Sequence, residues 1–322
     1  MAADIDQIVD RRRLRRKLTF WRVATILALV LALGAGGYYF SLRPLESTPH
    51  VARLVIGGVI RNDRDRVEMI ERIANSRAAA VIVSINSPGG TVTGSEQLYD
   101  ALRRLSERKP VVAVVEGMAA SGAYIAAMGC DRIFSRRNAI VGSVGVIFQF
   151  PNVHDLMKSV GISVEEIKSS PLKAAPSMFE PTSPEARAAI NSLVVDSYAW
   201  FKGLVAERRN LAGTALDTVV DGRVFTGHQG LDLHLVDEIG DERAARAWLT
   251  RERGVPEALR VRTWVNRSNF SSFGWMMAGA AQLLDGLGFT AMSHLLSDMV
   301  DPAFERAQLD GLLTLWHPRP GF

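Results

Sequence analysis

Ser121 lies in a run of small residues and is the first candidate for a nucleophile in this sequence. Glycine or alanine occupies positions 117, 119, 120, 122, 123, 126 and 127, directly after an apolar segment that is typical of a buried strand. Residues this small permit a tight turn from strand to helix. We therefore expect Ser121 at or near the start of a helix, where free backbone N–H groups stabilise negative charge on oxygen. The alternative is an ordinary helix cap, a common role of serine.

A second candidate is the Ser-Pro-Gly-Gly segment at residues 87–90, which is predicted to turn the chain after a strand ending at Asn86. No side chain shields the amides of Gly89 and Gly90, and open α/β sheets bind ligands at the carboxyl ends of their strands. We expect these amides to form an oxyanion hole. The alternative is a purely structural Pro-Gly turn. The segment is not a phosphate-binding loop, because no Gly-Lys-Ser/Thr follows it.

A serine nucleophile needs a base, because its free hydroxyl is a weak nucleophile. No histidine is an obvious partner in the sequence, and Ala-Ala-Ser-Gly-Ala is not a GxSxG elbow. A lysine serves as a base when burial keeps it neutral. Lys173, with leucine before it and two alanines after it, is expected in such a desolvated setting, and Lys168 is the next candidate. The alternative for either lysine is a solvated surface charge.

Other kinds of chemistry have little support. The six histidines are scattered and there is no HExxH or CxxC spacing, so we expect neither a metal site nor a cofactor. The single cysteine, Cys130, forms no intrachain disulfide and does not report the compartment. The net charge of +4 is carried by residues 1–22, which hold seven basic and three acidic residues, so the remainder is neutral. This distribution argues against a nucleic-acid partner.

The elements that must position these residues alternate along the chain between strand and helix. Apolar runs predict strands at residues 51–60, 78–86, 111–117 and 139–149. Helices are predicted at residues 65–75, 95–108, from about Ser121, and at 151–160, 184–211 and 241–252. Alternation of this kind indicates parallel βαβ units and an α/β fold.

The amino-terminal segment predicts a membrane anchor. Residues 23–40 carry no charge over 18 positions, enough for a helix of about 27 Å against a bilayer core of ~30 Å. Aromatic residues flank this stretch, and the basic run that precedes it places residues 1–22 in the cytoplasm. The alternative is a cleaved signal peptide. Residues 263–322 are apolar but interrupted by polar residues, which favours a helical extension that packs on the protein; association with a membrane surface is the alternative.

Five motifs in order resemble the signal peptide peptidase A family of bacterial membrane serine proteases, in its short form. The resemblance covers roughly Leu54 to Arg246. The matching segments are NSPGG (86–90), ASGAY (120–124), GSVGV (142–146), IKSSPLK (167–173) and DGRVFTGHQGLDLHLVDEIG (221–240). Each motif alone is weak, whereas their order behind a predicted anchor is specific.

The resemblance implies a crotonase/Clp-like α/β superfold and a Ser-Lys dyad of Ser121 and Lys173. It implies an oxyanion hole at Gly89 or Gly90 and Gly122, and Ser143 is expected to orient the lysine. The implied substrates are cleaved signal peptides and other unfolded apolar peptides. A homo-oligomer is also implied, since adjacent subunits contribute to one site in this family.

These implications give the chain a layout and a location. The layout is a basic cytoplasmic tail (1–22), a transmembrane anchor (23–40), a linker (41–52), a serine peptidase domain (53–262) and an apolar helical extension (263–322). The implied location is the bacterial inner (plasma) membrane, crossed once, with the catalytic domain outside the cytoplasm.

The sequence departs from the family pattern at several positions near the predicted base. Ser170 and Ala174 replace a usual glycine and a usual acidic residue, and His234 replaces a glycine in the last motif. There are two alternative functions. A crotonase-like acyl-CoA enzyme would need paired carboxylates, and Glu116 is the only acid beside the Ser121 turn. A catalytically silent membrane scaffold would need neither Ser121 nor Lys173.

Overall fold

The computed structural model describes residues 48–265 and Leu313–Leu315, together with Lys17, Trp21 and Thr25. The chain divides into two units, Met1–Thr48 and Pro49–Phe322, and every named element lies in the second. The predicted anchor at 23–40 lies outside the described residues, apart from Thr25. None of the helices in the described residues is both long and apolar enough to cross a bilayer.

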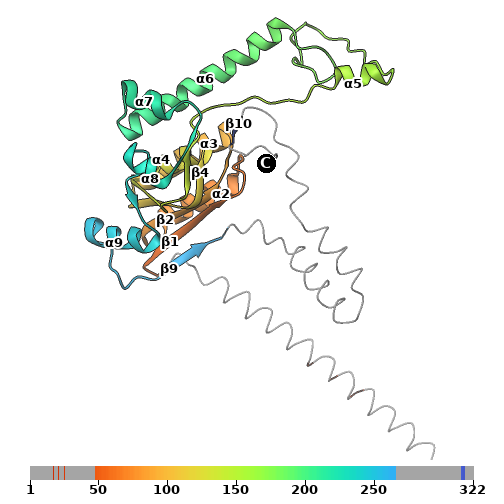
Figure 1. The fold of residues 1–322 in the computed structure, drawn as a ribbon. Helices are drawn as coiled ribbons and strands as arrows, with labels where there is room; N and C mark the ends of the chain where they lie inside the picture. Colours follow the sequence, from red (N-terminus) through yellow and green to blue (C-terminus); the bar gives the residue numbers. More distant parts are fainter. Residues whose placement is uncertain (1–16, 18–20, 22–24, 26–47, 266–312, 316–322) are drawn as a thin grey trace, which may run out of the picture. The chain divides into compact units, whose positions relative to one another are not determined.

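A mixed sheet of eight strands forms the centre of the second unit (Figure 1). Its main path runs β7-β6-β4-β2-β1-β9, and β5 joins β4 to β8. Every pair is parallel except β6 with β7, so the predicted α/β class is confirmed. The strands are β1 His50–Gly57, β2 Ala78–Ser87, β4 Val111–Ala120, β5 Arg132–Ser135, β6 Ile140–Gly142, β7 Val224–Thr226, β8 Glu238–Ile239 and β9 Val261–Trp264.

Helices cover both faces of this sheet. On one face lie α2 (Arg64–Asn75), α3 (Val92–Ser106), α4 (Gly122–Met128) and the carboxyl-terminal part of α6 (Pro184–Arg209). On the other face α9 (Glu242–Arg253) packs against β2 and β4. The remaining helices are α5 His154–Ser159, α7 Gly213–Val219 and α8 Gly227–Asp232.

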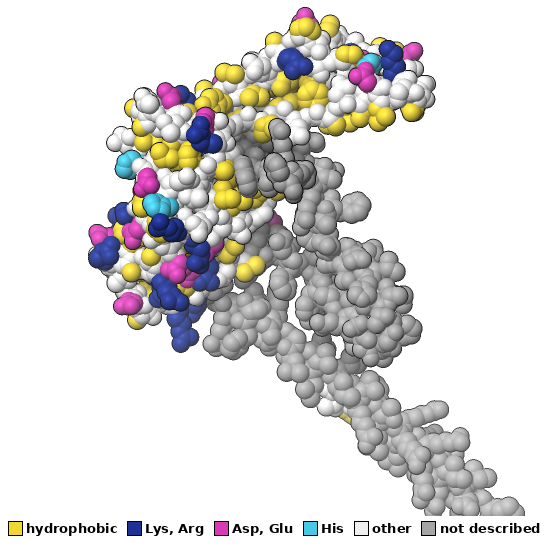
Figure 2. Space-filling view, in the orientation of Figure 1, with side chains coloured by type: hydrophobic (Ala, Val, Ile, Leu, Met, Phe, Trp, Pro, Cys, Tyr) yellow, Lys and Arg dark blue, Asp and Glu magenta, His cyan; other side chains and the backbone are white. Residues whose placement is uncertain are grey.

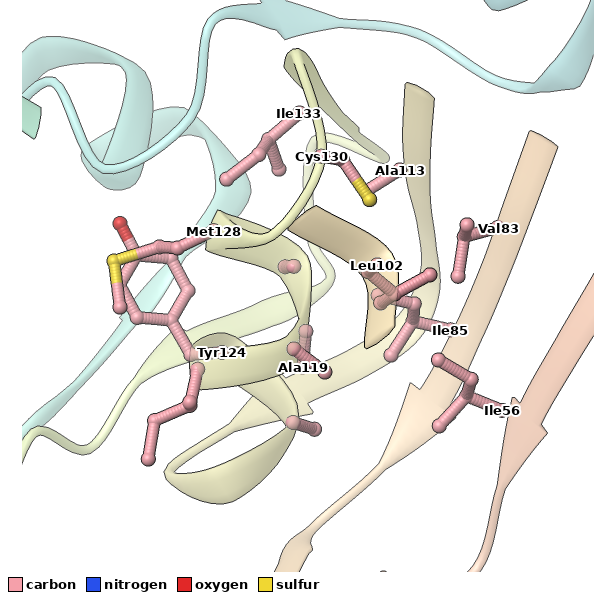
Figure 3. Packing of buried hydrophobic residues seen from close by; sticks show 14 of the residues in the cluster. Ile56, Val83, Ile85, Leu102, Ala113, Ala119, Tyr124, Met128, Cys130 and Ile133 are labelled. Carbon is pink, nitrogen blue, oxygen red and sulfur yellow. The ribbon is translucent and has the colours of Figure 1, made fainter. Parts of the chain in front are cut away.

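The uninterrupted apolar sequence of β2 follows from this double cover. Val83 and Ile85 face the larger core beside α3 and α4, which Figure 3 shows together with Leu102. Ala80 and Ile82 face the smaller core under α9. Each buried branched side chain contributes roughly 1.5–3 kcal/mol relative to its exposed state, so a polar residue on either face of β2 would be costly.

Two predicted elements differ from the structure. The strand expected at residues 139–149 is only three residues long, because Gly142 (φ 93°) and Ser143 (φ 54°) turn the backbone out of the extended conformation. The segment predicted as a Pro-Gly turn continues instead as a short strand, β3 (Gly89–Thr91). A bridge between Ile60 and Gly90 holds this extension, and the antiparallel strand β10 (Leu313–Leu315) pairs with it.

The domain limits drawn from the sequence fall inside strands. The predicted linker ended at 52 and the predicted domain at 262, whereas β1 begins at His50 and β9 ends at Trp264. The rest of the extension predicted to be helical lies outside the described residues, except Leu313–Leu315, which are extended.

Residues 151–195, here called the arm, stand apart from this layered core. The carboxyl-terminal half of α6 is anchored by Phe201, Leu204 and Val205, which are buried. Its amino-terminal half exposes apolar side chains such as those of Leu193 and Val195. Figure 1 shows α5 and the segment that joins it to α6 at the outer end of this helix, away from the sheet. A helix of 26 residues is about 39 Å long, so its far end leaves the core.

Candidate active site

Ser121 occupies the junction between β4 and α4 in a strained conformation. Its backbone φ is 55° and its ψ is −118°, in a region that non-glycine residues rarely adopt. The Ser121 N–H donates to the Gly142 carbonyl (2.7 Å), and the Ser121 carbonyl accepts from the Tyr124 N–H (2.9 Å). The hydroxyl makes no capping hydrogen bond to α4, so the role of an ordinary helix cap does not explain this serine. Strain of this kind is typical of active sites.

Ser143, which was expected to orient the lysine, lies beside Ser121. Ala120 and Gly142 are partners in the β4–β6 pairing, so the residue after each strand lies at the same edge of the sheet. The Ser143 N–H donates to the Arg223 carbonyl at 2.8 Å, and this contact fixes its positive φ. The two serines are both buried, at 1% and 8% exposure, and both follow directly on paired strand ends.

Gly89 and Gly90 are brought to the same edge by the pairing of β2 with β4. Ser87 is the register partner of Ala119, two residues before Ser121, and α4 contacts β3. Both glycines have partners in this structure: the Gly89 N–H donates to Ser87 Oγ at 3.2 Å, and Gly90 pairs with β10. A Cβ at Gly90 would lie 1.8 Å from the Ile60 carbonyl oxygen, so only glycine fits.

Strand β3 has one occupied edge and one edge that receives an extended segment. The Ile60 N–H donates to the Gly89 carbonyl (2.8 Å), and the Ile60 carbonyl accepts from the Thr91 N–H (2.9 Å). Backbone polar groups alternate between the two edges of a strand, so those of Gly90 face away from Ile60. On that side Thr314 of β10 is the register partner of Gly90. Because β10 also contacts α4, an extended backbone lies along β3 near the helix that starts at Ser121.

Lys173 is not joined to Ser121 within one chain. It lies on the arm between α5 and α6, its side chain is exposed, and it makes no ion pair within the described part of the chain. The start of α6 at Pro184 is about 25 Å along the helix from the buried Phe201, because Phe201 lies 17 positions further along the helix. A general base needs hydrogen-bond reach of about 3 Å. The desolvated setting expected for Lys173 is therefore not found in a single chain.

Lys168, the other candidate base, is a partner in two ion pairs. Its ammonium lies 2.6 Å from Glu166 Oε2 and 2.8 Å from Glu180 Oε2. The hydrogen bond with Glu166, and then that with Glu180, raises the pKa of Lys168 above its ordinary value. The side chain therefore stays protonated at physiological pH, which excludes it as a proton acceptor in this conformation.

Two residues near the site have structural roles that the sequence alone did not reveal. The hydroxyl of Tyr124, in the ASGAY motif, donates to the Leu235 carbonyl at 2.7 Å and ties α4 to the segment after α8. Burial raises the pKa of Tyr124, so this hydroxyl keeps its proton. His234, at the position where the resembled family usually has glycine, has a φ of 58°. Glycine adopts this left-handed conformation without strain, which explains why glycine is usual at that position.

Rival chemistries are not favoured by the surroundings of Cys130 and Glu116. Cys130 is buried, and burial raises the pKa of its thiol, so it is not a reactive thiolate. Glu116 is paired with Arg136 (2.7 Å) rather than with a second carboxylate. Over the described residues, no group of three or more His, Cys, Asp or Glu side chains is arranged to hold a metal.

Comparison with known proteins gives one matching family and several relatives. The description "Peptidase family S49" belongs to the family whose profile matches residues 103–256. A putative protease of Synechocystis sp. is 37% identical over 216 residues, which cover 66% of this chain and 78% of that protein. The putative signal peptide peptidase SppA of Enterococcus faecium is 27% identical, over 78% of this chain and 77% of its own.

Two other matches are more partial. Protease 4 of Haemophilus influenzae is 32% identical over 50% of this chain but only 26% of its own length. Among solved structures, a point mutant of ClpP1 from Listeria monocytogenes aligns with a TM-score of 0.41 and 15% identity, over 60% of this chain and 92% of that chain. The α/β assignment rests on the strand order described above.

Proposed function

We propose that this chain, which belongs to peptidase family S49, the signal peptide peptidase A family, cleaves peptide bonds with Ser121 as nucleophile and Lys173 as general base. Membership of the family makes the chain a protease. The serine mechanism is supported by the strained, uncapped Ser121 at the end of β4. The fold we propose is of the crotonase/Clp type.

The chemistry is acyl transfer to water. As Ser121 Oγ bonds to the substrate carbonyl carbon, its proton moves to neutral Lys173 Nζ. The Gly122 amide at the first position of α4, with the Gly89 or Gly90 amide, stabilises the oxyanion. The C–N bond then breaks and the departing amine takes the proton from Lys173. Water, deprotonated by Lys173, releases the acyl group from Ser121, and Ser143 orients the lysine.

The observation that best supports a peptide as the substrate is the pairing of β10 with β3. It shows that the edge of β3 beside α4 accepts an extended backbone in antiparallel register. Addition of a strand to an exposed edge is a general mode of peptide recognition. An unfolded peptide that takes the place of β10 would run along Gly89 and Gly90 toward Ser121.

The separation of Lys173 from Ser121 supports assembly of the site from two copies of the chain. Figure 2 shows apolar side chains gathered on the arm. They include Leu156, Val160 and Ile167, which are among the most exposed apolar side chains of the described residues. A surface of this kind marks an interface. We propose that the arm of one copy packs on the core of the next, where burial favours the neutral form of Lys173.

The natural substrates we propose are cleaved signal peptides and other unfolded apolar peptides. Residues 23–40 would anchor the enzyme in the bacterial inner membrane with its catalytic domain outside the cytoplasm. A signal peptide that leaves the membrane unfolded has the apolar side chains and the free backbone groups that pairing along β3 requires. The name of one relative supports this substrate class, because the Enterococcus protein is called a putative signal peptide peptidase.

The test compares the full-length chain with Ser121→Ala and Lys173→Ala on a fluorogenic apolar peptide between pH 6 and 10. A lysine accepts a proton only in its neutral form, so activity should rise toward alkaline pH. Both substitutions should reduce kcat to background while the oligomer remains intact. Activity that survives Lys173→Ala would move the base elsewhere. A folded wild-type oligomer without activity would favour the scaffold function.

A further inference from the structure

The stretch of chain that carries Lys173 has no regular structure of its own. Residues 161–183, between α5 and α6, form neither helix nor strand. Within residues 168–177 only two backbone hydrogen bonds are made, from the Lys173 N–H to the Ser170 carbonyl (3.0 Å) and from the Ala175 N–H to the Leu172 carbonyl (3.3 Å). Side chains must therefore hold this loop in place, because its backbone lacks the ladder of bonds that fixes helices and strands.

One end of this loop is fixed to α5. The Val153 N–H donates to the Met178 carbonyl at 2.8 Å, and the Asn152 side chain donates to the Glu180 carbonyl at the same distance. A third link joins the His154 ring to the Phe179 carbonyl. Residues 178–180 are thus fixed independently of what precedes Lys173.

The other end is closed onto the first by Lys168. Its ammonium bridges Glu166 (2.6 Å) and Glu180 (2.8 Å), and only 15% of its side chain is exposed. Ser177 adds a parallel link, since its hydroxyl donates to the second oxygen of Glu166 at 3.1 Å. Lys173 lies five residues after Lys168 and four before Ser177, at the middle of the closed loop.

We infer that Lys168 is a positioning residue, whose charge clamps Glu166 and Glu180 together and so presents Lys173 at the tip of an ordered loop. This inference rests on the proposed role of Lys173 as the base. The two lysines then have different roles, positioning for Lys168 and proton transfer for Lys173, because their surroundings differ. Lys168 is held between two carboxylates and stays charged, whereas Lys173 pairs with no acidic side chain among the described residues and can lose its proton on burial.

The clamp matters because a flexible loop would have to be ordered at every encounter with Ser121. Closing a loop costs free energy that a preformed link removes. Misplacement of a catalytic group by about 1 Å costs up to roughly 100-fold in rate. Removing the clamp should therefore reduce kcat more than it changes KM, because the peptide itself binds along β3 of the core.

The test uses Lys168→Met, which keeps the length of the side chain without its charge, and Lys168→Arg, which keeps the charge. The matched control is Lys158→Met, since Lys158 is an exposed lysine of α5 with no ion pair among the described residues. Each change is made in the full-length chain. Loop order is measured without reference to activity, in a Ser121→Ala background, as the rate of limited tryptic cleavage after Lys173.

Lys168→Met should raise the rate of this cleavage about tenfold and lower kcat by about 10- to 100-fold. The dependence of the remaining activity on pH should be unchanged. Lys168→Arg should stay within about threefold of wild type in both assays, and Lys158→Met should change neither. A wild-type enzyme without activity would end the proposed function, yet the tryptic cleavage would still decide whether the clamp orders the loop.

Two results would overturn the inference. The first is wild-type cleavage and wild-type kcat in Lys168→Met, which would leave the two ion pairs without a positioning role. The second is loss of activity to background in both Lys168 variants, as complete as in Lys173→Ala and with no change in cleavage. That result would make Lys168 a catalytic group.

Discussion

Two inactive variants should restore each other if the site is shared between copies. Ser121→Ala removes the proposed nucleophile on the core, and Lys173→Ala removes the proposed base on the arm. Ser121 is buried in the core, whereas Lys173 is exposed on the arm, which reaches the core through α6 with Pro184 about 25 Å along the helix from the buried Phe201. A shared site takes its serine from one copy and its lysine from the next, so a mixed oligomer contains some sites with both.

The size of the recovery follows from random assembly. In an equal mixture each site has a chance of one half of an intact serine and one half of an intact lysine, so about one quarter of the sites are complete. We expect about a quarter of the wild-type kcat per chain from co-expressed Ser121→Ala and Lys173→Ala. If the dyad formed within one chain, every chain in the mixture would lack one member and the activity would remain at background.

The assay is peptide hydrolysis at alkaline pH, with the two chains carrying different affinity tags and purified through both. Each variant expressed alone gives the background. A matched control mixes wild type with the double variant Ser121→Ala/Lys173→Ala, which should give about one quarter for a shared site and one half for a site within one chain. Background activity in the first mixture and one half in the second would refute the shared site.

Two further predictions concern β3. Gly90→Ala should lower the thermal midpoint by several degrees and reduce kcat, because its Cβ would lie 1.8 Å from the Ile60 carbonyl oxygen and overpacking costs about 1–3 kcal/mol. The control is Gly203→Ala, whose Cβ would have no atom within 4 Å and which should not destabilise the protein. Equal thermal midpoints for the two variants would contradict the steric argument. A chain that ends at Gly311 lacks β10 and should show a KM several-fold lower at similar kcat, whereas an unchanged KM would mean that β10 and the substrate do not compete for β3.

Much of the core could be predicted from local patterns. The helices at residues 65–75 and 241–252 were placed to within a residue of α2 and α9, and the apolar run after residue 77 gave β2. These elements can be recognised from the sequence because their buried side chains recur with a fixed period, about one in two along a strand and three in seven along a helix. The α/β class then follows from their alternation.

The places where prediction failed depend on contacts between distant residues. The segment at Gly89 and Gly90 has the composition of a turn, yet it is extended because Ile60 bridges it on one edge and β10 on the other. β6 ends at Gly142, where the carbonyl accepts a hydrogen bond from the Ser121 N–H and the Phe225 ring leaves little room for a side chain. These contacts, and not the strand propensity of the segment, decide where the strand ends. No window of a few residues contains that information.

The candidate site shows the same division. Ser121 was predicted at the start of a helix after a strand, and α4 does begin directly after it. The pairing of β4 with β6 brings Ser143 to the same edge of the sheet, whereas its predicted role, to orient the lysine, stays a prediction. The surroundings of Lys173 could not be predicted, because leucine and alanine neighbours say nothing of whether a loop lies on the core or beyond it. A desolvated setting was expected for Lys173, and its side chain is exposed in a single chain.

The arm suggests a physical reason why the proposed nucleophile and the proposed base lie on separate parts of the chain. A lysine near a serine in water is protonated and inert, so a dyad becomes active only where an apolar contact removes water from the lysine. If Lys173 were buried in its own core, the desolvation cost would be borne during folding. In the proposed assembly, the lysine is carried on a clamped loop beside Leu172 and other exposed apolar side chains, and it is desolvated only when the arm docks. Proteolysis would then begin with assembly, and a lone copy would fold without an active site.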